Sequence, residues 1–145
     1  MVHRARWSVA VILILGALIL GACSEDGDGD GPKVELQEFS VSVNPSSGAA
    51  GSTTFSVENV GGVTHEFVVV KTDLDEASLP TTDDGSVDEA GAGIEAVDEI
   101  EDIEPGSSPT LTVDLDAGTY VLFCNVVDGT QVHYQSGMHT TFTVE

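Results

Sequence analysis

Basic residues are scarce in this chain of 145 residues. Only four lysines and arginines stand against 25 aspartates and glutamates, a formal net charge of −21 at pH 7. Arg4 and Arg6 lie before Cys23, so residues 23–145 combine two lysines with all 25 acidic residues, a formal charge of −23. Such a surface repels nucleic acid and anionic lipid headgroups. We therefore expect no nucleic-acid partner, and we expect any protein partner to be basic.

Cysteine is also scarce, because Cys23 and Cys124 are the only two. The sequence has no C-x-x-C pair, no glycine-rich phosphate loop and no convincing Ser/His/Asp set, so thioredoxin-like, phosphoryl-transfer and hydrolytic chemistry are poorly supported. It also lacks the second set of histidines that a multinuclear metal centre requires. We therefore expect a protein that is not an enzyme.

The only long apolar run begins near the N-terminus. Residues 9–20 follow a positively charged start and are too short and wrongly flanked for a spanning helix, which is typical of a secretory leader. The next residues, Leu20-Gly21-Ala22-Cys23, resemble the lipobox of bacterial lipoproteins, in which the cysteine is diacylated and becomes the first mature residue. The resemblance implies a signal peptide over residues 1–22 and a domain outside the cytoplasm that Cys23 anchors to the membrane. An unlipidated Cys23 after ordinary cleavage is the alternative.

Residues 23–32 predict a flexible, acidic tether. Asp26, Asp28 and Asp30 also mimic the opening of an EF-hand calcium loop. The position that requires a bidentate glutamate holds Gln37, however, and no helix flanks the segment. We therefore interpret it as a solvated linker.

Beyond the tether, apolar and polar residues alternate over short stretches bounded by turn residues. This pattern predicts strands over residues 34–36, 39–43, 53–57, 67–70, 109–115, 119–124 and 140–144. The parity shift near Glu38 indicates a bulge there. The unbroken run from Phe67 to Val70 is typical of a strand buried on both faces. We expect one all-β domain over residues 33–145, an antiparallel Greek-key sandwich or barrel.

One acidic insertion, residues 73–104, interrupts the strand pattern. Ile94, Val97 and Ile100 recur at a helical spacing, which predicts one to two helical turns within it. Its carboxylates show no recognisable ligand spacing, so we interpret them as a solvated face.

Cys124, His133 and Met138 share one loop between two strand-like runs. Sulfur ligands beside an imidazole suit copper that cycles between Cu(I) and Cu(II). His65 opens a buried strand about sixty residues earlier, and the order His, Cys, His, Met is that of a type 1 copper site. If Cys23 carries lipid, Cys124 has no disulfide partner, and metal ligation explains why a lone exported thiol is tolerated. A disulfide between the two cysteines is the competing interpretation.

Three segments carry a family resemblance: Asn59-Val-Gly-Gly-Val-Thr-His65, Gly118-Thr-Tyr-Val-Leu-Phe-Cys124 and His133-Tyr-Gln-Ser-Gly-Met138. Together they resemble the cupredoxins, the blue copper family of plastocyanin and azurin. The resemblance implies that His65 and His133 are the two imidazole ligands, Cys124 the thiolate ligand and Met138 the weak axial thioether. Eight residues separate Cys124 from His133, more than in the smaller members of the family. We expect the surplus, residues 128–132, to loop outward.

Three residues next to the candidate ligands in the sequence carry polar side chains that could also act at the site. Thr64 and Asn125 flank ligands, and we predict that their polar groups tie the two ligand loops together. His139 could replace Met138 as a ligand, but Met138 shares the parity of the inward-facing Phe142, which favours Met138.

These observations favour a membrane-anchored carrier of single electrons between redox partners outside the cytoplasm. Two alternatives stay open. One is a module that binds or delivers copper without electron transfer, and the other is an interaction domain of the same fold without metal. The long spacing between Cys124 and His133 keeps both alternatives open.

Overall fold

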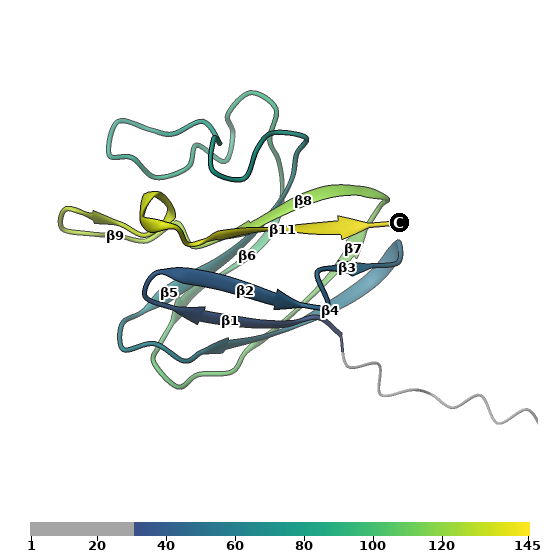
Figure 1. The fold of residues 1–145 in the computed structure, drawn as a ribbon, viewed down its shortest axis with the longest axis horizontal. Helices are drawn as coiled ribbons and strands as arrows, with labels where there is room; N and C mark the ends of the chain where they lie inside the picture. The colour runs from purple at the N-terminus through teal and green to yellow at the C-terminus, as the bar shows by residue number, and fades with distance from the viewer. Residues whose placement is uncertain (1–30) are drawn as a thin grey trace, which may run out of the picture.

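The computed structural model describes residues 31–145, and strands dominate this range (Figure 1). The predicted leader, Cys23 and most of the tether lie outside the described residues. The strands are β1 (Lys33–Gln37), β2 (Ser40–Asn44), β3 (Ser47–Gly48), β4 (Gly51–Asn59), β5 (His65–Lys71), β6 (Glu95–Ile103), β7 (Thr110–Leu115), β8 (Gly118–Phe123), β9 (Val127–Asp128), β10 (Gln131–Val132) and β11 (His139–Val144). One 3-10 turn, η1 (Tyr134–Ser136), precedes β11. Within residues 31–145, no helix is long and apolar enough to cross a membrane.

Two sheets face each other and form a sandwich (Figure 1). One has the order β2-β1-β4-β7 and the other the order β3-β11-β8-β5-β6. The predicted all-β sandwich is confirmed, but its sheets are mixed, because β1 pairs with β4 and β3 with β11 in parallel. The chain crosses to the second sheet at β3 before it returns as β4, and this crossing lets β4 run in the direction of β1.

The core between the sheets is aromatic at its centre. Phe55 is fully buried and meets the rings of Phe67 and Phe142 edge to face, at centroid distances of 5.5 and 5.3 Å. Edge-to-face pairs add to the stabilisation that apolar burial provides. The run from Phe67 to Val70 is buried on both faces, as predicted, because a second apolar cluster covers the outer side of β5.

The parity shift near Glu38 comes from a turn and not from the predicted bulge. Gln37 pairs with Ser40, so Glu38 and Phe39 form a two-residue connection between β1 and β2. A turn reverses the chain and restarts the alternation, which leaves the same parity change in the sequence as a bulge would.

The predicted helical turns in the insertion are wrong, because residues 95–103 form β6 along the edge of β5. Two register shifts in this pairing each add a residue on the β6 side. They bring Val97, Ile100 and Ile103 to the core at a spacing of three, which mimics a helical period. The irregular loop is therefore shorter than predicted. It covers residues 72–94, here called the excursion, and it is the teal loop above β11 in Figure 1.

Candidate metal centre

Three predicted ligands converge at one end of the sandwich. His65 begins β5, Cys124 directly follows β8, and His133 lies between β10 and η1. The Nδ1 atoms of the two histidines are 3.2 Å apart, and the Cys124 Sγ lies 3.7 Å from His65 Nδ1 and 3.4 Å from His133 Nδ1. All three side chains are buried. Strand pairing thus brings together residues that are 59 and 68 positions apart in the chain.

The size of this triangle fits a first-row transition metal. An ion bound at about 2.0 Å to imidazole nitrogen and about 2.3 Å to thiolate sulfur holds such donors roughly 3.5 to 3.8 Å apart in a trigonal plane. The edges of the triangle, 3.2 to 3.7 Å, approach these values. Two imidazoles and one thiolate in this arrangement, with Met138 nearby in the fold, fit a type 1 copper site.

Burial sets the protonation of the three groups. It lowers the pKa of both His65 and His133, so that both imidazoles are neutral at pH 7. It raises the pKa of Cys124 to about 11, against the opposing effect of the Glu66 N–H, which donates to Sγ at 3.3 Å. The copper-free site therefore holds two neutral imidazoles and one protonated thiol.

Glu38 and Asn59 orient His65. Glu38 Oε1 accepts hydrogen bonds from the N–H groups of Gly62 and Val63. It also lies 3.3 Å from Nε2 of His65, the ring nitrogen that faces away from the site, but the two atoms are not aligned for a hydrogen bond. The two backbone N–H groups lower the pKa of Glu38. A carboxylate beside Nε2 favours the tautomer that leaves Nδ1 unprotonated and directed into the site.

The Asn59 side chain shapes the loop that leads to His65. It is buried, donates to the carbonyls of Val63 and Ile103, and accepts the Gly61 N–H. Sequence reasoning missed both supports of His65. Asn-x-Gly is a turn signal that could have pointed to Asn59, whereas nothing in the sequence links Glu38 to a histidine 27 positions later.

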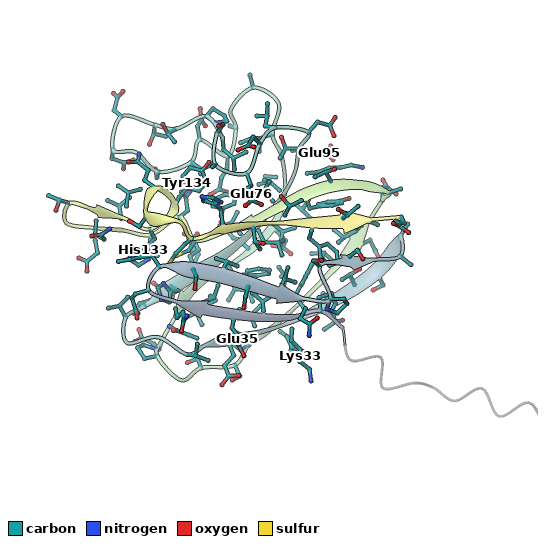
Figure 2. All side chains as sticks on the ribbon, viewed as in Figure 1. Lys33, Glu35, Glu76, Glu95, His133 and Tyr134 are labelled. Carbon is teal, nitrogen blue, oxygen red and sulfur yellow. The ribbon has the colours of Figure 1, made fainter. Side chains whose placement is uncertain are left out.

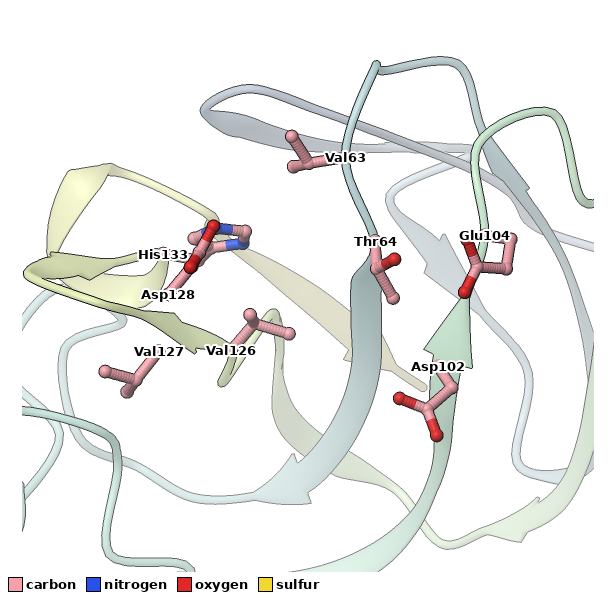
Figure 3. A pocket seen from close by; sticks show the side chains of 8 residues that line it. All are labelled: Val63, Thr64, Asp102, Glu104, Val126, Val127, Asp128 and His133. Carbon is pink, nitrogen blue, oxygen red and sulfur yellow. The ribbon is translucent and has the colours of Figure 1, made fainter.

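His133 is more enclosed than a surface ligand, with 2% of its surface exposed. Phe39 covers it edge to face at a centroid distance of 5.3 Å and is itself 37% exposed. A pocket of about 540 Å³ opens beside His133. Figure 3 shows His133 and Asp128 on one side of this pocket and Thr64 and Glu104 on the other.

Comparison with known proteins identifies the fold. No protein-family model and no curated protein matches the chain. The reduced auracyanin of the photosynthetic bacterium Roseiflexus castenholzii has a TM-score of 0.55 at 22% identity, over 78% of this chain and 94% of its own. Auracyanin B has a TM-score of 0.51 at 21% identity, over 78% and 86%. This chain has the cupredoxin fold.

Within this cupredoxin fold, backbone hydrogen bonds link Met138 to Cys124 and to His133. Met138 is fully buried, its carbonyl accepts the Cys124 N–H at 3.0 Å, and its own N–H donates to the His133 carbonyl at 3.2 Å. His139, the alternative ligand, lies on the other side of the chain, where its Nδ1 is 3.5 Å from Glu76 Oε1. This placement is the one that strand parity predicts, and the axial role of Met138 stays a prediction.

The surplus between Cys124 and His133 forms a small hairpin of β9 and β10 at one tip of the molecule (Figure 1). Gly129 occupies its turn with a φ of 60°, a conformation that glycine adopts without steric cost. Most of the hairpin is exposed. The extra residues thus loop outward, as expected, and the histidine and cysteine still meet.

The two residues predicted to tie the ligand loops together have different surroundings. Thr64 lines the pocket beside His133. Asn125 directs its side chain to the excursion, where it bonds to Val87 and Glu89. Whether these contacts tune the metal stays a prediction.

A group of three carboxylates lies close to the site. The oxygens of Glu66, Glu89 and Glu99 come within 4.8 Å of one another. Burial, followed by the charges of Glu99 and Glu89, raises the pKa of Glu66 to about 7. Burial also raises the pKa of Glu89. The carboxylates repel one another, and protonation relieves this repulsion.

Proposed function

We propose that this protein carries single electrons through a type 1 copper ion held by His65, Cys124 and His133, with Met138 as the weak axial ligand. The observation that supports the proposal most strongly is the buried triangle of two Nδ1 atoms and one Sγ, with edges of 3.2 to 3.7 Å. Copper in such a site supplies a reversible one-electron change between Cu(I) and Cu(II).

The chain contributes rigidity. His65 is the first residue of β5, Cys124 directly follows β8, and Met138 directly precedes β11. Strands β5, β8 and β11 are neighbours in one sheet, so their ends keep a common geometry. Ligands held in this way rearrange little when the charge of the ion changes, which favours rapid electron transfer.

Titration of the purified protein with Cu(II) tests this proposal. We expect one equivalent to bind and to produce an intense blue absorption from charge transfer between the Cys124 thiolate and copper. Cys124→Ser should bind copper without this colour. A colourless one-to-one complex of the parent would favour a copper-handling module, and no binding would favour an interaction domain without metal.

The axial position separates a carrier from a copper-handling module. A weak thioether tunes the potential, so Met138→Leu should keep copper and colour and shift the reduction potential upward. A delivery site instead depends on the thioether to hold Cu(I), and the same substitution would then lower Cu(I) affinity by about tenfold or more. Cu(I) competition and voltammetry of both proteins distinguish the two results.

We further propose that a lipid on Cys23 anchors the domain outside the cytoplasm. The lipobox-like Leu20-Gly21-Ala22-Cys23 supports this, and a formal charge of −23 on residues 23–145 leaves no electrostatic attraction to anionic lipid. Cys23→Ser should move the protein from the membrane to the soluble fraction. Retention of the variant in the membrane would refute the anchor.

The same charge supports a basic redox partner. Asp102, Glu104 and Asp128 line the pocket beside His133, and Val63 and Val127, exposed at 39% and 37%, lie on the same rim. We expect a cationic redox protein to exchange electrons faster than an anionic one, with a rate that falls as salt is added. Equal rates with partners of both charges would contradict this proposal.

A further inference from the structure

The excursion is a packed part of the domain. Its two ends are joined where the Thr72 hydroxyl donates to the Gly93 carbonyl at 2.7 Å. Its residues Leu79 and Val87 are buried and pack in the second apolar cluster, together with Tyr134. This cluster lies on the outer face of β5 and β8, so the excursion covers the outer face of the two strands that lead to His65 and Cys124.

Tyr134, the residue after His133, is held by the excursion. Its hydroxyl donates to the Glu76 carbonyl and accepts the Leu79 N–H, both at 2.9 Å. Tyr134 is 4% exposed, and its ring meets that of Phe123 edge to face at 5.8 Å. Figure 2 shows Tyr134 beside Glu76, between the excursion and β11.

Asn125, the residue after Cys124, is held by a later part of the same excursion. Its Oδ1 accepts the Val87 N–H at 2.7 Å, and its Nδ2 donates to the Val87 carbonyl at 3.1 Å and to Glu89 at 2.9 Å. The side chain thus pairs with both backbone groups of one excursion residue.

His139, the residue after Met138, completes the pattern. Its Nδ1 lies 3.5 Å from a Glu76 carboxylate oxygen, and the other oxygen of that carboxylate accepts the Thr141 hydroxyl. Successive side chains of an extended chain point to opposite sides. Asn125 and His139 therefore point away from Cys124 and Met138, toward the excursion, whereas Tyr134 reaches the excursion from the 3-10 turn that begins after His133.

We propose that the excursion is a clamp that positions the loops of Cys124, His133 and Met138, with Asn125 and Tyr134 as the positioning residues. This inference rests on the proposed function, because it concerns the same site. The excursion hydrogen-bonds to the residues after Cys124 and His133, and its Glu76 carboxylate lies beside the residue after Met138. A shift of any of the three loops would therefore disturb a contact to the excursion. The clamp holds the ligands in a binding geometry before copper arrives, which reduces the free energy spent on ordering them.

Two substitutions test the clamp. Tyr134→Phe removes the hydroxyl that binds the excursion and keeps the ring packing. Asn125→Ala acts at a half-buried position and removes the second connection. Tyr120→Phe is the matched control, because the Tyr120 hydroxyl also donates to a carbonyl, that of Asp116 at 2.8 Å, and Tyr120 is buried near the other end of β8.

The first measurement is amide hydrogen exchange of the copper-free protein. The N–H groups of Ser136, Gly137 and Met138 bond within the ligand loop. Their exchange should be at least tenfold faster in Tyr134→Phe, while Tyr120→Phe leaves them at the parent rate. The second measurement is on the copper form, where both clamp variants should bind Cu(I) about tenfold or more weakly and shift the reduction potential and the charge-transfer band.

The possible failures are distinguishable. Parent-like loop exchange, potential and absorption band in both clamp variants would overturn the clamp, even if the parent is blue. An equal shift of the potential in Tyr120→Phe would also overturn it, because the effect would then follow from general destabilisation. If the parent binds no copper, the proposed function fails, and faster loop exchange in the clamp variants still supports the positioning of the loops.

Discussion

The affinity of this protein for Cu(I) should rise with pH, because copper binding removes the proton of Cys124. Thiolate is the form that binds metal. Burial raises the pKa of Cys124 to about 11, so the thiol of the copper-free protein is protonated at neutral pH. Burial also lowers the pKa of His65 and His133, so neither imidazole carries a proton that copper must displace above about pH 6.5.

The size of the pH effect follows from the raised pKa of Cys124 and from the number of protons released on copper binding. Between pH 7 and pH 10, one proton leaves for each copper bound, so the apparent affinity should rise tenfold per pH unit, about a thousandfold in total. At pH 7.5 the thiol lies about 3.5 units below its pKa, so its ionisation costs about 5 kcal/mol of copper-binding free energy. At still lower pH, below the lowered pKa values of His65 and His133, the slope should steepen, because protonated imidazoles then also lose their protons on binding.

Competition with a Cu(I) chelator of known protonation constants measures this slope. Calorimetry in two buffers of different ionisation enthalpy counts the released protons independently. His133→Ala should weaken binding and keep the slope above pH 7, whereas Cys124→Ala should abolish it. A parent slope near zero would mean that Cys124 is not a ligand, or that its thiol is already ionised, and either result refutes the reasoning.

Three further predictions concern the core, the carboxylate group and the support of His65. Phe55→Ala should lower the free energy of unfolding by about 3 to 5 kcal/mol in urea titrations, while Val60→Ala, at a position 46% exposed, should change it by less than about 0.5 kcal/mol. The folded pKa of Glu66, about 7, exceeds its unfolded value of 4.5, so the stability of the copper-free protein should fall as pH rises from about 4.5 to 7. Glu66→Gln should remove on the order of 1 kcal/mol of this loss, since solvent partly screens the group, and an unchanged pH profile would contradict the assignment. Glu38→Gln should weaken Cu(I) binding about tenfold in chelator competition, and unchanged affinity would show that His65 needs no carboxylate behind it.

The strand pattern was readable in the sequence because each strand has one face on the core. Val34 and Leu36 in β1, and Leu111 and Val113 in β7, alternate with exposed polar residues and are buried in the structure. Alternation of apolar and polar residues did not predict the strand where the pairing between β5 and β6 is irregular. The spacing of Val97 and Ile100 resembles a helix only because two register shifts in the β5–β6 ladder move these side chains onto one face.

The candidate ligands could be named from the sequence because metal chemistry depends on residue type. A thiol, two imidazoles and a thioether next to strand-like segments narrow the choice of metal before any coordinates are known. The outward path of the hairpin over β9 and β10 was also predictable, since a few surplus residues close a loop at little entropic cost.

The sequence by itself determined the all-β class, the buried alternation and a copper-like set of donors, since these depend on local periodicity and on the chemistry of single residues. Only the tertiary structure decided what surrounds those donors. Glu38 reaches His65 because the turn between β1 and β2 lies against the loop before β5, and the excursion reaches Asn125 and Tyr134 because it folds over the outer face of the sheet. Such contacts join residues tens of positions apart, and their partners follow from packing that no local pattern records.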